Sequence, residues 1–72
     1  MPHPMYDKFL IRVIDSYDVA KVLNEELYTA RRVMGRMRKR YGKEKHQPLI
    51  LQDFINYTGL IVENVVAILG WK

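Results

Sequence analysis

The chain has 72 residues, enough for one domain with a small core, and it contains no cysteine, which excludes a disulfide framework and a thiolate metal site. Its net charge at pH 7 is +4, and 49% of its residues are hydrophobic, a composition that argues against disorder. The longest apolar stretch, residues 59 to 71, is interrupted by two polar residues and is too short to span a bilayer. Since the first residues show no secretory signal, we expect a cytoplasmic protein.

The charge is distributed unevenly along the chain. Eight basic residues and one acidic residue lie between positions 29 and 47, whereas the rest of the chain has four basic and seven acidic residues. A segregated positive field of this kind favours an anionic partner.

The N-terminal part of the chain predicts little regular structure. Residues 1 to 8 contain two prolines and predict a loose lead-in. The apolar run FLIRVI at 9 to 14 is either a short strand or the buried entry to a helix, because periodicity does not decide so short a run. A strand there would form a hairpin with residues 48 to 51.

Two helices are predicted in the middle of the chain. The first covers residues 16 to 23, with Asp15 as its N-cap, Asp18 at capping-box spacing, and Asn24 in a left-handed conformation at its end. The second runs from about Glu26 to Tyr41 and ends at Gly42. Its apolar residues fall within an arc of about 120 degrees. They are Leu27, Ala30, Val33, Met34, Met37 and Tyr41.

The sequence of the C-terminal third allows two arrangements of helices. One is a short helix over residues 52 to 57 followed by a second helix over residues 62 to 69. The other is a single continuous helix that contains Gly59. A glycine inside a helix costs about 1 kcal/mol relative to alanine, so the broken arrangement is favoured.

The two middle helices have the spacing of a helix-turn-helix. This motif needs apolar residues at set offsets, a small residue at the helix crossing and a turn residue that accepts positive φ. The matching positions are Val19, Ala20, Leu23, Asn24, Ala30 and Val33. Glu25 disagrees, because an aliphatic residue normally fills the core just after the turn. Either Leu27 fills it instead, or the turn is longer than usual.

These observations predict one mainly α domain over residues 1 to 72. It would have three to four helices, including a helix-turn-helix, with or without a short strand or hairpin.

The chain resembles short helix-turn-helix DNA-binding proteins related to excisionases and MerR-like regulators, which are frequent on bacterial mobile elements. The motifs that carry this resemblance lie between residues 13 and 69. They are Asp18-Val19-Ala20 with Leu23, Thr29-Ala30-Arg31-Arg32, Tyr41-Gly42-Lys43, Asp53-Phe54 and Tyr57-Thr58-Gly59-Leu60. The sequence differs from the family at Asn24 and Glu25 in the turn, and at Ile50 and Ile61, where capping residues would be expected.

The resemblance implies that the second helix contacts DNA bases and that the protein acts in transcription control or recombination directionality. The base-contacting positions it implies are Tyr28, Thr29, Arg31 and Arg32. The two arginines also point outward on a helical wheel, where a guanidinium can bind guanine O6 and N7. Basic residues further along are expected to bind phosphates. They are Arg36, Arg38, Lys39, Arg40, Lys43 and Lys45.

Gly35 is unexpected within the second helix, since glycine disfavours helix. It projects onto the polar arc, where it either lets DNA approach the backbone closely or is simply tolerated at the surface.

Other functions have weaker support in the sequence. The expected partner is double-stranded DNA, without cofactor, small-molecule ligand or membrane, and an enzyme is not expected because no nucleophile and base are paired. His3 and His46 lack a second ligand at useful spacing, so no metal site is predicted. The alternatives are a protein-interaction module that uses the C-terminal apolar segment and, third, RNA binding. Trp71 and residues 65 to 69 either pack within the chain or form a homodimer.

Overall fold

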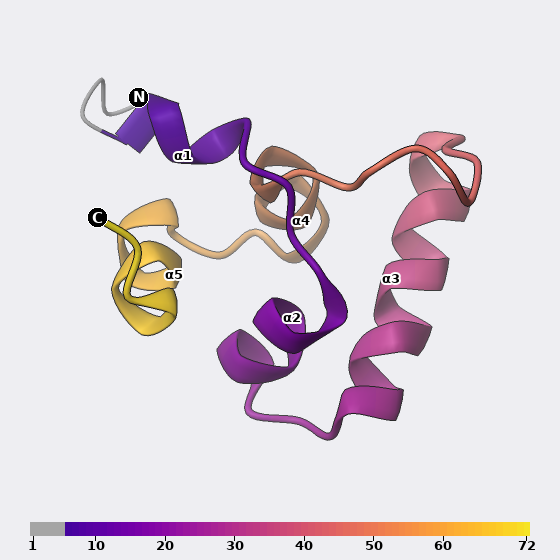
Figure 1. Ribbon diagram of the computed structural model, residues 1–72, viewed down its shortest axis with the longest axis horizontal. Helices are drawn as coiled ribbons and strands as arrows, with labels where there is room; N and C mark the ends of the chain where they lie inside the picture. The colour runs from indigo at the N-terminus through magenta and orange to yellow at the C-terminus, as the bar shows by residue number, and fades with distance from the viewer. Residues whose placement is uncertain (1–5) are drawn as a thin grey trace.

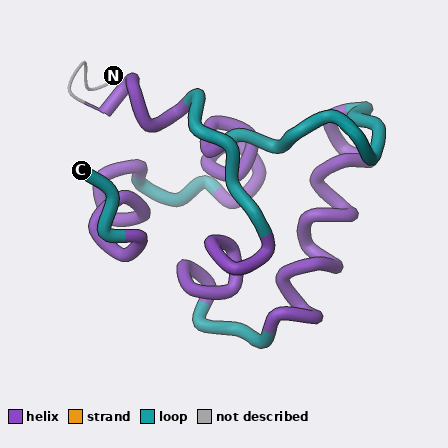
Figure 2. The backbone as a smooth tube through the Cα atoms, in the orientation of Figure 1, coloured by secondary structure: helices purple, strands orange, loops and turns teal. Residues whose placement is uncertain are grey.

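The computed structural model describes residues 6–72, which form five helices and no strand (Figures 1 and 2). The helices are α1 (Asp7–Leu10), α2 (Ser16–Leu23), α3 (Leu27–Tyr41), α4 (Leu51–Thr58) and α5 (Val62–Leu69). The predicted mainly α domain is confirmed. The described residues contain five helices, one more than the upper predicted number of four, because the single-turn helix α1 precedes α2.

Residues 9 to 14 combine the two structures that their sequence left open. Phe9 lies in α1 and is buried, whereas Val13 forms an isolated antiparallel bridge with Ile50. Two backbone hydrogen bonds, of 2.9 and 3.0 Å, flank this bridge and tie the segment before α2 to the segment before α4. The predicted hairpin is therefore reduced to one bridge. Of the predicted lead-in, residues 1 to 5 lie outside the described residues, and residues 7 and 8 belong to α1.

The predicted bounds and caps of α2 are confirmed. The Asp15 carboxylate accepts a hydrogen bond from the Asp18 N–H at 2.9 Å, and the Asp18 carboxylate accepts one from the Asp15 N–H at 3.1 Å. These bonds satisfy amides that a helix start leaves unpaired. At the other end Asn24 is left-handed, with φ of 54°, and the chain turns into α3 within three residues.

The helix α3 is amphipathic in the predicted register. Ala30, Met34 and Met37 are buried, and the flanking apolar residues Val33 and Tyr41 are half-buried. The helix ends at Gly42, whose φ of 66° is left-handed and strained for residues with a Cβ.

The C-terminal segment is broken into two helices, as favoured from the sequence. Gly59 has φ of 74° and ends α4, so the chain cannot continue as one helix. The residues before α4 and α5 are Ile50 and Ile61, which have no side-chain acceptor. Before α4, the Asp53 carboxylate compensates by accepting the Ile50 N–H at 2.9 Å.

The turn between α2 and α3 uses neither arrangement suggested for Glu25. Glu25 is exposed, Leu27 is only half-buried, and the turn is not extended. The buried residues nearest the turn are instead Val19 of α2 and Ala30 of α3, which are 1% and 0% exposed. The pair thus consists of two helices joined by a three-residue turn, with no buried aliphatic residue just after that turn.

The helices are arranged with α3 along one side, α1 and α5 on the other, and α2 and α4 between them (Figure 1). The core contains residues from every helix, including Phe9, Val19, Met37, Phe54 and Val65. Since α2 and α4 both contact α3, they support its apolar face and leave its other face to solvent.

Most of the C-terminal apolar run packs within the chain. Val65 and Val66 are buried, and the ring of Trp71 lies 6.1 Å from that of Phe9, with the Arg12 guanidinium 4.1 Å from the centroid of the Trp71 ring. Ile68 remains 44% exposed. The homodimer stays a prediction.

Candidate nucleic-acid interface

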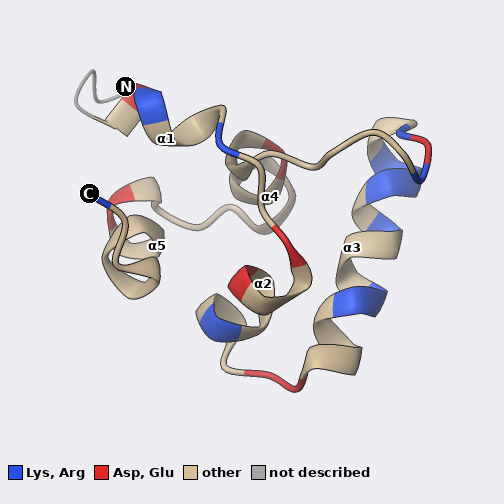
Figure 3. Cartoon of the chain, in the orientation of Figure 1, with Lys and Arg blue, Asp and Glu red and all other residues tan. Residues whose placement is uncertain are grey.

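The candidate interface is the solvent face of α3, which carries basic side chains along its length (Figure 3). The helix contains six arginines and lysines and no acidic residue. Because the apolar residues of α3 pack in the core, five of these six cations are exposed on the opposite side. The result is a rigid cationic surface with no carboxylate on the same helix to neutralise it.

The four predicted base-contacting residues share the first half of α3. Tyr28 is 60% exposed, and both Arg31 and Arg32 are exposed. Thr29 is half-buried at the edge of the same face. Three of the four side chains are therefore accessible to a partner.

The six predicted phosphate-binding residues divide into two groups. Arg36, Lys39, Arg40 and Lys45 are exposed. Arg38 and Lys43 are half-buried and are hydrogen-bonded within the protein. We therefore give these two residues a structural role.

Arg38 holds the loop that follows α3. Its Nη1 donates to the Glu44 carbonyl at 2.9 Å and to the Gln47 carbonyl, and both bonds use the same guanidinium nitrogen. A cation in the last turn of a helix can bind carbonyls of the chain that turns back past it. The loop is thereby held against α3.

Lys43 anchors the same loop to α4. Its Nζ lies 2.6 Å from Asp53 Oδ2 and 3.1 Å from the Pro48 carbonyl, and the two charged side chains are 25% and 15% exposed. The carboxylate also accepts the Ile50 N–H, so one aspartate joins the loop, the bridge and the helix start. An acidic residue three positions after a helix start was the only sequence signal for this arrangement.

We expect Lys43→Met to destabilise the fold by about 1 to 3 kcal/mol, because the half-buried Asp53 carboxylate loses its charged partner. Urea unfolding followed by circular dichroism measures this change. Lys45→Met is the matched control, since it removes the same charge from an exposed position in the same loop. It should leave stability unchanged. If Lys43→Met were as stable as Lys45→Met, the structural assignment of Lys43 would be wrong.

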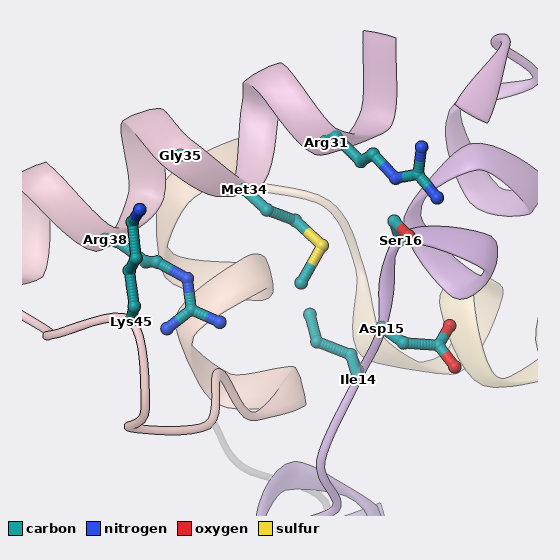
Figure 4. A pocket seen from close by; sticks show the side chains of 8 residues that line it. All are labelled: Ile14, Asp15, Ser16, Arg31, Met34, Gly35, Arg38 and Lys45. Carbon is teal, nitrogen blue, oxygen red and sulfur yellow. The ribbon is translucent and has the colours of Figure 1, made fainter. Parts of the chain in front are cut away.

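Two adjoining grooves run along the basic face of α3. The first, of about 420 Å³, lies between α3 and the segment that enters α2 (Figure 4). Ile14 and Met34 lie at its centre, Arg31 and Ser16 at one end, and Arg38 and Lys45 at the other (Figure 4). The second, of about 490 Å³, lies between α3 and the loop after it. Its lining includes Gly35, Arg38, Lys39 and Lys43 to Lys45, and Gly35 also lines the first groove.

Two carboxylates mark the acidic side of the first groove. Asp15 lines the groove, and Asp18 is its capping partner. Burial raises the pKa of the Asp18 carboxyl above its ordinary value of 3.8, and the negative charge of Asp15 adds to this rise. The Asp15 carboxylate would repel an anion in the groove, whereas Arg31 and Arg38 would attract it to the α3 side.

Among residues 6–72, no three side chains of His, Cys, Asp or Glu are grouped so that they could hold a metal ion. None of the five described helices has the length and apolar character needed to cross a membrane.

Comparison with protein-family models, with curated proteins and with solved structures finds no match. The resemblance to excisionase-like and MerR-like proteins therefore stays a prediction.

Proposed function

We propose that the protein binds double-stranded DNA in a sequence-specific manner, with α3 as the recognition helix. The proposed role is that of a small transcriptional regulator or an excisionase-like factor.

The observation that supports this proposal is the uniform positive charge on the exposed face of α3. The helix has 15 residues and is about 22 Å long, so it can lie in a major groove about 12 Å wide. Its connection to α2 by a three-residue turn, together with its contact to α4, supports it from behind. Arg32, Arg36 and Arg40 are exposed and follow one another at i, i+4 spacing, where like charges repel. These charges do not stabilise the helix, which supports a role in binding an anion.

The basic residues are proposed to act in two sets. Arg31 and Arg32, near the start of α3, contact base edges together with Tyr28 and Thr29. The exposed cations further along bind phosphates, which position the protein without reading sequence. This second set is Arg36, Lys39, Arg40 and Lys45.

Selection of bound sequences from random duplex DNA tests the proposal. We expect a shared sequence motif among the selected duplexes and an affinity that falls steeply with salt as counterions are released. A two-fold symmetric motif would indicate a homodimer on two half-sites. If no duplex bound at low salt, DNA binding would be ruled out.

A second candidate function is a protein-interaction module. The observation in its favour is the exposure of Ile61 and Ile68, at 60% and 44%, at the start of and within α5. In this case the C-terminal apolar segment would contact a partner or a second copy of the chain. Ile68→Asp should then abolish the complex, as measured by light scattering.

A further inference from the structure

Gly35 is the residue of α3 that neither folding nor base contact explains. Glycine is the least favourable residue in a helix interior apart from proline. A Cβ at position 35 would meet no atom within 4 Å, so no neighbouring part of the described structure requires glycine there. The backbone is ordinary helix, since Gly35 is not among the residues with positive φ. A functional role of Gly35 would therefore involve contact with a molecule outside the chain.

Four cations surround Gly35 on the helix surface. Residues three and four positions apart are neighbours on one helix face. The residues at those four offsets from Gly35 are Arg31, Arg32, Arg38 and Lys39. Mutual repulsion within such a ring opposes folding, whereas an anion at its centre would relieve it.

The two grooves beside α3 meet at Gly35, where no side chain covers the helix backbone. Gly35 lines both of them, and so do Arg38 and Lys45. The Arg38 side chain is turned toward the loop, where it is held by two carbonyls, and this leaves the space over Gly35 open. The two grooves therefore adjoin along α3 at Gly35 and together form a cationic depression, with Asp15 at one end and Glu44 at the other as the acidic lining residues.

We propose that the sugar-phosphate backbone of a DNA strand crosses α3 at Gly35. This inference rests on the proposed DNA-binding function and adds the crossing point. The missing side chain lets a phosphate approach the helix backbone closely, as glycine does at many ligand contacts. Arg31 and Arg32 lie on the side of this strand that faces the major groove. Lys39 and Lys45 lie on the other side and bind its phosphates.

Gly35→Ala tests the crossing point, because its effects on stability and binding have opposite signs. The melting temperature should rise by roughly 4 to 8 °C, since alanine favours helix and meets no neighbour. The affinity for the selected duplex should fall about tenfold, with a smaller salt slope because a phosphate contact is lost. Gly35→Gln, with a longer uncharged side chain, should weaken binding further.

Asn64→Ala serves as the control, because it makes a similar helix-favouring change at an exposed position of α5 outside both grooves. It should leave DNA affinity unchanged. If Gly35→Ala binds DNA as tightly as the unmodified chain while Arg31→Ala weakens binding, the crossing point is wrong and the proposed function stands. If the unmodified chain does not bind duplex DNA, the proposed function fails and the crossing point fails with it.

Discussion

The double variant Arg31→Ala/Arg32→Ala should bind its selected duplex roughly 100-fold more weakly than the unmodified protein. Each bidentate contact between arginine and guanine contributes about 1 to 3 kcal/mol of discrimination, and the variant removes two candidate contacts. Both side chains are exposed, so the fold should remain intact. Fluorescence anisotropy across a salt series measures the affinity, and circular dichroism checks the fold.

Two further variants distinguish the contribution of base contacts to the affinity from that of positive charge. Arg31→Lys/Arg32→Lys keeps both charges but loses the planar fork, so the salt slope should stay unchanged while discrimination between duplexes falls. Lys21→Ala/Lys72→Ala removes two charges outside α3, from α2 and the C-terminal residue (Figure 3), and should have a small effect. If the alanine variant of the two arginines bound the selected duplex normally, α3 would not be the recognition helix.

Phe54→Ala should leave the protein largely unfolded at room temperature. The Phe54 side chain is 1% exposed and belongs to the core between the helices. Truncation of a buried phenylalanine to alanine costs about 3 to 5 kcal/mol, and a domain of this size has little stability in reserve. Because α4 also carries Asp53, which binds Lys43 in the loop after α3, unfolding of α4 would release this loop. The loop holds Lys45 beside α3.

Chemical unfolding followed by far-ultraviolet circular dichroism measures this effect. Tyr17→Ala provides the control, since it removes an aromatic ring of similar size that is 67% exposed on α2. Its stability should change by no more than about 0.5 kcal/mol. Equal stability of the two variants would show that α4 does not pack in the core as described.

The helix bounds follow from signals within a few residues of one another. Asp15 and Asp18 predict the start of α2, Asn24 its end, and Gly42 and Gly59 the ends of α3 and α4. These signals are reliable here because capping and left-handed termination depend on local backbone geometry. The alternation of apolar and basic residues in α3 likewise predicted which face would be buried.

The sequence by itself thus predicted α2 to α5 and the basic face of α3, but not the single-turn helix α1. Tertiary structure decided which cations are free, because the partners of Arg38 and Lys43 are carbonyls and a carboxylate five to ten residues away. Their positions depend on the path of the loop after α3, and the bridge between Val13 and Ile50 helps to set that path. No local pattern predicts such a path, since it results from the simultaneous packing of α2 and α4 against α3.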